Sequence, residues 1–196
     1  IGLMYTHAHL RYAEALWQFG DAEGFFEALS KAIPIGIRDL VSSAAPRQAN
    51  CYFSSSDATF RDRYQAYEEY DRIKEGTVPL EGGWRVYSSG AGIASGLIVR
   101  ALLGLRVTRD AVWVDPVVPM ALDGLRIEID LGNHRFDIRY ERGTKGSGPE
   151  ALVLNGTPLP FERLDNPYRV GGVRVAMGLW REALVSDINR LEIRIG

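Results

Sequence analysis

The hydrophobic period of the chain changes from that of helices to that of strands near residue 106, and this change constrains the fold most. Before it, apolar residues recur at helical spacing, as in residues 5–19; after it, apolar and polar residues alternate. The alternating segments are residues 126–131, 135–141 and 191–195. The sequence therefore predicts an α+β chain, with a helical part over residues 1–105 and an antiparallel β-sandwich over residues 106–196.

Capping residues delimit the helices of the first part. A helix over residues 5–19 should end at Gly20 as its C-terminal cap, and Asp21 should cap a second helix that stops before Pro34. We expect these two helices to form an antiparallel hairpin. Residues 34–81 carry no strong period apart from a short helix within residues 62–74, and a further apolar helix should run from Ile93 towards Gly104.

Turn residues delimit the strands of the second part. Gly132-Asn133 and Asn155-Gly156 are typical of tight hairpin turns, the second pair of a type I′ turn. The segment at residues 112–119 lies between the helical and alternating parts, so we expect it to dock the sheet on the helices.

The stretch GGWRVYSSGAGI at residues 82–93 is rich in glycine and serine and leads into the apolar helix. Small residues allow close approach of the backbone to a ligand, and a helix start offers unpaired N–H groups and a positive dipole end to an anion. The same pattern also occurs where a turn only caps a helix. It is not a Walker-A loop, because it lacks the Gly-Lys-Ser/Thr ending. It is not a dinucleotide fingerprint either, because no strand-like apolar run precedes it.

Composition excludes several classes of partner. The chain has 196 residues and a formal net charge of -2, and its Lys and Arg residues are scattered, which disfavours nucleic-acid binding. Cys51 is the single cysteine, which fits a reducing compartment, and no apolar run is long enough to span a bilayer. We therefore expect a cytoplasmic protein without a membrane segment. Because the chain lacks an initiator methionine and starts directly in a helical pattern, we expect it to begin within a larger domain.

Four segments resemble, in their order, the C-terminal part of glycoside hydrolase family 94, the inverting β-glucoside phosphorylases. They are MYTHA at residues 4–8, PRQANCYFSSSD at residues 46–57, GGWRVYSSGAG at residues 82–92 and VDP at residues 114–116. The serine-rich loop is most similar to the 1,2-β-oligoglucan phosphorylase branch. The resemblance implies that residues 1–105 are the last helices of an (α/α)6 catalytic barrel and that residues 106–196 are the C-terminal β-sandwich.

The resemblance also implies site residues. His7 matches the phosphate-binding histidine, and Ser88 and Ser89 stand where a Thr-Gly pair is usual, so Ser89 departs from the pattern. Gln48 resembles the glutamine that contacts the glycone, and Arg47 lies beside it. The co-substrate would be inorganic phosphate, with no further cofactor, and the sugar a β-glucan oligosaccharide. The catalytic acid and the rest of the barrel would lie upstream of residue 1, so the isolated chain should be inactive; a homodimer is common in the family.

Plainer interpretations remain beside these. His7 fits a structural role at a helix start, and His7 with His9 lacks a third ligand for a metal, so no metal site is predicted. The carboxylates at residues 57–69 lie among arginines and are expected to form ion pairs. As a whole, the chain could instead be a non-catalytic carbohydrate-binding or scaffolding module, or the phosphorylase module of a membrane-bound glucan synthase.

Overall fold

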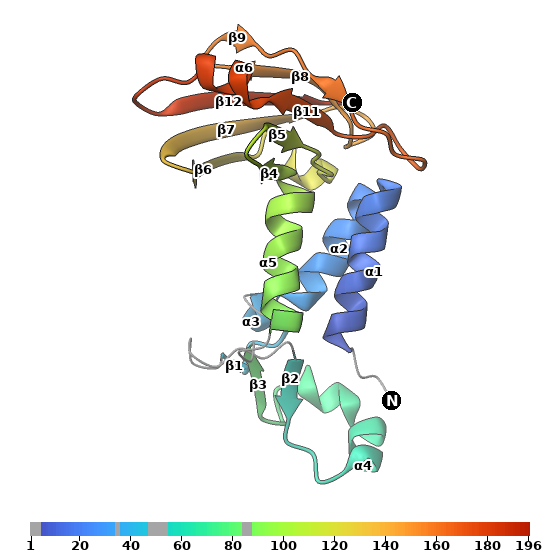
Figure 1. The fold of residues 1–196 in the computed structure, drawn as a ribbon. Helices are drawn as coiled ribbons and strands as arrows, with labels where there is room; N and C mark the ends of the chain where they lie inside the picture. Colours follow the sequence, from blue (N-terminus) through green and yellow to red (C-terminus); the bar gives the residue numbers. More distant parts are fainter. Residues whose placement is uncertain (1–4, 34–35, 47–54, 84–87) are drawn as a thin grey trace. The chain divides into compact units, whose positions relative to one another are not determined.

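The computed structural model describes residues 5–33, 36–46, 55–83 and 88–196. The described chain falls into two compact units. Unit 1 consists of Ile1–Tyr12 and Glu27–Ser95, and unit 2 of Ala13–Phe26 and Gly96–Gly196. Both units include parts of the same helices, because helices α1 and α2 and the helical segment around α5 each cross from one unit into the other (Figure 1).

The predicted helical hairpin is confirmed. Helix α1 spans Thr6–Phe19 and helix α2 spans Ala22–Ala32. Gly20 ends α1 with φ +79°, a conformation that glycine adopts without strain, and Asp21 N donates to Leu16 O across the turn. The Asp21 carboxylate accepts from Gly24 N at 2.9 Å and so caps α2, as the sequence indicated.

Unit 1 also contains a small sheet and short helices. The strands are β1 (Ala45–Pro46), β2 (Ser55–Ala58) and β3 (Leu80–Gly83), in the order β1-β3-β2, with β1 parallel and β2 antiparallel to β3. The short helices are α3 (Ile37–Leu40), α4 (Arg63–Glu68) and the 3-10 helix η2 (Tyr70–Ile73). Val41, Ala44 and Leu80 form their buried core. Residues 36–46 and 55–81, which were expected to be largely irregular, thus contain more regular structure than their weak periodicity predicted.

The helical segment that follows β3 is unusual in its winding. It begins with a π-helical turn, η3 (Ser88–Gly92), continues as α5 (Ile93–Leu97) and ends in a second π-helical turn, η4 (Ile98–Leu102). Gly104, with φ +68°, closes the segment as predicted, because a Cβ there would lie 2.1 Å from Pro116 N. Leu105, directly after Gly104, already belongs to a strand.

Two sheets with a shared core make up most of unit 2, which gives the chain an α+β fold with a β-sandwich-like C-terminal domain. The first has the order β10-β11-β5-β4 and the second β6-β7-β12-β8-β9. Their bounds are β4 (Leu105–Val107), β5 (Ala111–Val114), β6 (Arg126–Leu131), β7 (His134–Arg142), β8 (Pro149–Leu154), β9 (Thr157–Pro158), β10 (Glu162–Arg163), β11 (Val173–Ala176) and β12 (Asn189–Ile195).

Alternation along the strands builds this core. Phe136, Ile138 and Tyr140 of β7 point inward, as do Leu191 and Ile193 of β12, and all are almost fully buried. Together with residues of β5 and β11 they form one hydrophobic cluster, which is how the two sheets are held face to face. Helix α6 (Met177–Glu182) covers the core with Trp180, and the 3-10 helix η5 (Met120–Leu122) precedes β6.

One strand pairing corrects the sequence prediction. The hairpins at Gly132 and at Asn155-Gly156 are confirmed, with Asn155 at φ 52° and Gly156 at φ 81°. However, β12 is inserted between β7 and β8, parallel to the former and antiparallel to the latter. The sheet is therefore mixed, not purely antiparallel as expected, because alternation reveals which face is buried but not the direction of the neighbouring strand.

Candidate functional site

The predicted phosphate-binding histidine opens helix α1. His7 lies in the first turn, half-buried, with its ring centroid 6.2 Å from that of Tyr5. Its neighbour His9 is engaged differently, because His9 Nε2 lies 2.7 Å from Ala28 O. This hydrogen bond ties the His9 side chain to helix α2.

The predicted phosphate-binding serines begin the helical segment after β3. Ser88 and Ser89 are the first residues of the π-helical turn η3, so the helix starts before Gly90 and not after Gly92. Single π-helical turns are rare and are frequently found at functional sites. Gly82 and Gly83, predicted to be part of a turn, instead end strand β3. Within unit 1, the first turns of α1 and of this segment lie at the same end, beside the small sheet (Figure 1).

The small sheet joins the two segments that were predicted to carry the sugar and phosphate contacts. Gly82 of β3 is paired with Pro46 on one side and with Ser56 on the other. Pro46 directly precedes Arg47 and Gln48, which lie outside the described residues. The last residues of β1 and β3 are thus neighbours in the sheet, and each strand is followed in the sequence by a segment predicted to contact substrate.

Carboxylates near this sheet are held by arginines, as expected. Asp62 pairs with Arg61, and Glu69 pairs with Arg72. The backbone hydrogen bond from Gln65, followed by that of the Arg61 side chain, lowers the pKa of Asp62 below its usual value. The hydrogen bond from Arg72 lowers the pKa of Glu69 in the same way. Both groups are therefore stabilised as anions and are poorly suited to donate a proton.

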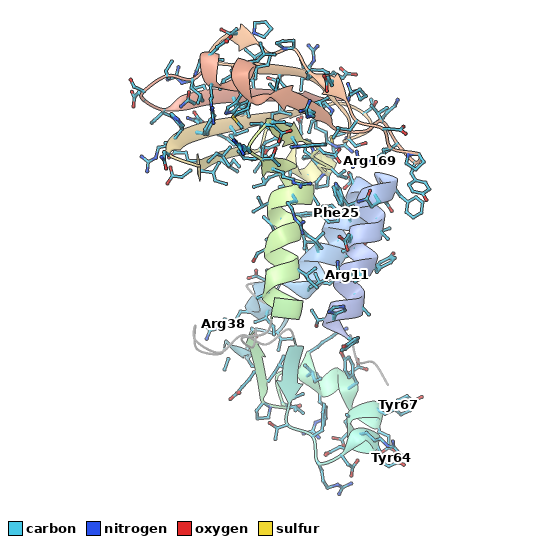
Figure 2. All side chains as sticks on the ribbon, in the orientation of Figure 1. Arg11, Phe25, Arg38, Tyr64, Tyr67 and Arg169 are labelled. Atoms are coloured by element: carbon cyan, nitrogen blue, oxygen red, sulfur yellow. The ribbon has the colours of Figure 1, made fainter. Side chains whose placement is uncertain are left out.

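Helix α4 carries exposed tyrosines on its surface. Tyr64 and Tyr67 project away from the rest of unit 1 (Figure 2). The Arg63 guanidinium lies 4.9 Å from the centre of the Tyr64 ring and covers one face of it.

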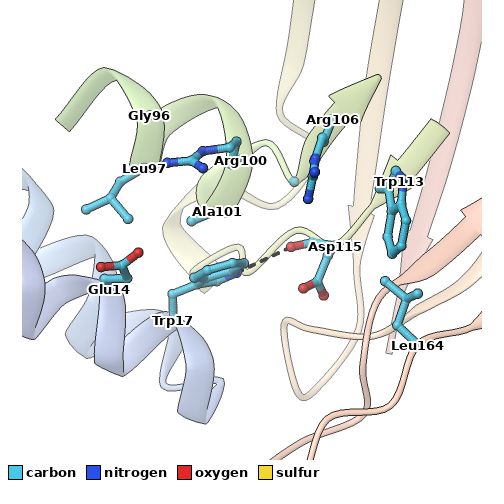
Figure 3. Close-up of a pocket in the computed structure, with 11 residues that line it drawn as sticks. Glu14, Trp17, Gly96, Leu97, Arg100, Ala101, Arg106, Trp113, Asp115 and Leu164 are labelled. Atoms are coloured by element: carbon cyan, nitrogen blue, oxygen red, sulfur yellow. Dashed lines mark hydrogen bonds between the residues drawn. The ribbon is translucent and has the colours of Figure 1, made fainter. Parts of the chain in front are cut away.

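A pocket in unit 2 was not anticipated from the sequence. Its cavity volume is about 150 Å³, and it lies where α1, the end of the α5 segment and the outer face of β4 and β5 meet (Figure 3). Its aromatic and charged lining residues are Trp17, Trp113, Glu14, Asp115, Arg100 and Arg106. None of the predicted site residues lines it.

The pocket could not be predicted from the sequence, because its lining residues come from separate segments that share no sequence pattern. Trp17 was assigned to an apolar helix face and Trp113 to a segment that docks the sheet on the helices. In the structure Trp113 belongs to β5 itself and faces away from the core, opposite Arg106 on β4. The Arg106 guanidinium lies 5.7 Å from the Trp113 ring centre. Trp113 stands between the buried Val112 and Val114, so nothing in its immediate sequence distinguishes it from a core residue.

Two further observations limit the chemistry of the described chain. In residues 5–33, 36–46, 55–83 and 88–196, no three His, Cys, Asp or Glu side chains gather as a metal ion would require. Every helix within these ranges is too short or too polar to cross a membrane.

Comparison with known proteins places the chain. It is 47% identical over 173 residues to a 1,2-β-oligoglucan phosphorylase of Listeria innocua, an overlap of 88% of this chain and 16% of the relative. The chain therefore spans about one sixth of the length of that relative. Residues 104–194 match the family model of the glycoside phosphorylase C-terminal domain. The resemblance to the C-terminal portion of family 94-like phosphorylases is thus confirmed by this relative and by the match of residues 104–194 to the glycoside phosphorylase C-terminal domain.

Proposed function

We propose that this chain is the C-terminal portion of an inverting glycoside phosphorylase that cleaves β-linked glucose oligosaccharides with phosphate and releases glucose 1-phosphate. The observation that carries the proposal is the 47% identity to the Listeria 1,2-β-oligoglucan phosphorylase, which extends over 88% of this chain. An overlap of this extent includes the helical part as well as the sandwich. We therefore favour β-1,2-linked glucose chains as the substrate.

In this proposal residues 1–105 are the last helices of an (α/α)6 barrel and residues 106–196 are the sandwich domain. The two compact units of the structure do not follow this division, because parts of α1, α2 and the α5 segment are grouped with the sandwich in unit 2. The single Cys51 supports a cytoplasmic location. A homodimer is proposed on the family resemblance alone.

We assign phosphate binding to His7, the Ser88 hydroxyl and the Ser89 backbone N–H, and glycone contacts to Gln48 with Arg47. In support, Ser88 and Ser89 begin a helical segment, where free N–H groups and the dipole favour an anion. The pairing of Gly82 with both Pro46 and Ser56 supports a common position for the two contact segments.

In phosphorolysis the main task of the protein is to position the phosphate and the sugar. Phosphate is itself the nucleophile and attacks the anomeric carbon on the face opposite to the leaving sugar, so the anion must be held in line. The leaving oxygen takes its proton from a carboxylic acid whose pKa must be raised for the task. The resemblance to family 94 implies that this acid belongs to a part of the barrel outside this chain, and we propose the same for this protein.

The test is phosphorolysis by the full-length protein. Glucose 1-phosphate release from β-1,2-linked glucose oligosaccharides should require phosphate. His7→Ala should lower kcat/KM for phosphate by at least about a hundredfold, as for loss of one anion-binding donor in a desolvated site. His134→Ala is the matched control, because His134 is the first residue of β7 and lies in the sandwich; this variant should keep full activity.

Two outcomes would contradict the proposal. Unchanged turnover of His7→Ala would remove the phosphate-site assignment. Sugar binding without any glucose 1-phosphate release, with or without phosphate, would instead favour a non-catalytic carbohydrate-binding or scaffolding module.

A further inference from the structure

The unit 2 pocket has the size of one sugar ring. A volume of about 150 Å³ is room for roughly five water molecules, at about 30 Å³ of liquid volume each. It is well below the several hundred Å³ of sites for large organic ligands. A small ring or a few ordered waters would fill it.

The walls of the pocket are aromatic on two sides. Trp17 comes from α1 and Trp113 from β5, and both side chains are half-buried. Leu97 and Leu164 complete the apolar part of the lining. Indole rings provide large rigid apolar faces at low entropic cost, so such walls suit a ligand with apolar C–H faces.

Charged side chains of both signs line the pocket. Glu14 and Asp115 contribute carboxylates, and Arg100 and Arg106 contribute guanidinium groups. Carboxylates only accept hydrogen bonds and guanidinium groups only donate them, whereas a hydroxyl group does both. A ligand that bears several hydroxyl groups can therefore bond to both kinds of side chain.

The pocket is also held in shape before any ligand binds. Arg169 Nη1 and Nη2 donate to the two Asp115 carboxylate oxygens at 2.7 and 2.9 Å, and Trp17 Nε1 donates to Asp115 O at 3.4 Å (Figure 3). Asp115 N donates to Gly104 O at 2.8 Å, which ties the strand end to the helical segment. A preformed site loses less entropy on binding.

We propose that this pocket binds a single neutral sugar ring, stacked on the indoles and hydrogen-bonded through its hydroxyl groups to the surrounding charges. The identification of that ring as a glucosyl unit of a β-glucan rests on the proposed function. The pocket then serves the same protein as a second contact for its oligosaccharide.

The test is a titration of the full 196-residue chain, labelled with ¹⁵N, with a β-1,2-linked glucose disaccharide. Saturable shifts are expected for the indole N–H signals of Trp17 and Trp113. The Trp180 signal should not move, because that ring is buried against Phe136. Arg106→Met should weaken binding by at least about tenfold, the loss of roughly one charge-assisted hydrogen bond. Arg181→Met, also exposed but on α6, is the control and should bind as the unchanged chain.

Three results would overturn the proposal: no saturable shift of the two signals, unchanged affinity of Arg106→Met, or shifts with inorganic phosphate at matched ionic strength but not with the disaccharide. The titration contains no phosphate and needs no turnover, so its failure is independent of the phosphorolysis assay. His7→Ala, which should lower kcat/KM for phosphate in the full-length protein, should leave these sugar-induced shifts unchanged.

Discussion

Replacement of Arg169 by methionine should destabilise unit 2 by about 3 kcal/mol. The Arg169 side chain is 5% exposed, and it donates to both oxygens of Asp115, to Trp17 O and to Val170 O. Removal of one partner of a buried ion pair typically costs 3–5 kcal/mol, because the other charge stays buried without compensation. Asp115 is 22% exposed, so water can reach part of it, and the lower end of this range applies.

The loss should be measured from urea unfolding, as a shift in midpoint at constant m-value. Lys31→Met is the matched control, because Lys31 and Glu27 form an ion pair whose side chains are 61% and 67% exposed. Its effect on the midpoint should be much smaller than that of Arg169→Met and should vanish in high salt, while the effect of Arg169→Met should persist there.

A double variant separates charge burial from lost packing. Arg169→Met with Asp115→Asn leaves no buried charge, and it should recover at least about 1 kcal/mol relative to Arg169→Met alone. Equal losses for Arg169→Met and Lys31→Met, or a double variant no more stable than the single one, would refute this reasoning.

Two further predictions concern backbone conformation and pH. Gly104→Ala should destabilise the fold by at least about 3 kcal/mol, because its φ is +68° and a Cβ there would lie 2.1 Å from Pro116 N. Gly124→Ala is the control: its φ is +75° but the space around it is open, so it should cost only about 1 kcal/mol. Equal midpoint shifts of the two variants in thermal unfolding would contradict this prediction. Asp62 caps α4, and its lowered pKa means that its contribution to stability is complete above the unfolded value of about 3.8 and is lost as the pH falls through the folded pKa. Amide-exchange protection at Gln65 should therefore fall in acid, and Asp62→Asn should flatten that dependence.

Local chemistry made much of the fold predictable. The caps at Gly20 and Asp21 and the turn at Asn155-Gly156 each follow from a residue whose side chain or φ decides a local conformation. The inward faces of β7 and β12 follow from simple alternation. Each of these features depends on residues close together in the chain, which is why a pattern reveals it.

Features that depend on distant residues were not predictable in this way. The parallel pairing of β12 with β7 leaves no trace in the alternation of either strand. Gly82 and Gly83 were expected in a turn, because the pairing with Pro46 and Ser56 that makes them strand residues comes from elsewhere in the chain.

The candidate site residues also divide into those found from local motifs and those brought together only by the fold. The family resemblance pointed to His7 and Ser88, whose types and spacing form recognisable motifs. The pocket between Trp17 and Trp113 is created only when a helix and a strand from different parts of the chain meet, so no local pattern contains it.

The position of β12 has a consequence for how the sandwich can be completed. This strand is the last one in the sequence, yet it fills the gap between β7 and β8. Until it is in place, each of these strands presents an open edge of unpaired N–H and C=O groups, flanked by the apolar faces of Phe136 and Leu152. A chain in which β12 has not yet paired therefore exposes two strand edges, and open edges of this kind favour association between copies during folding.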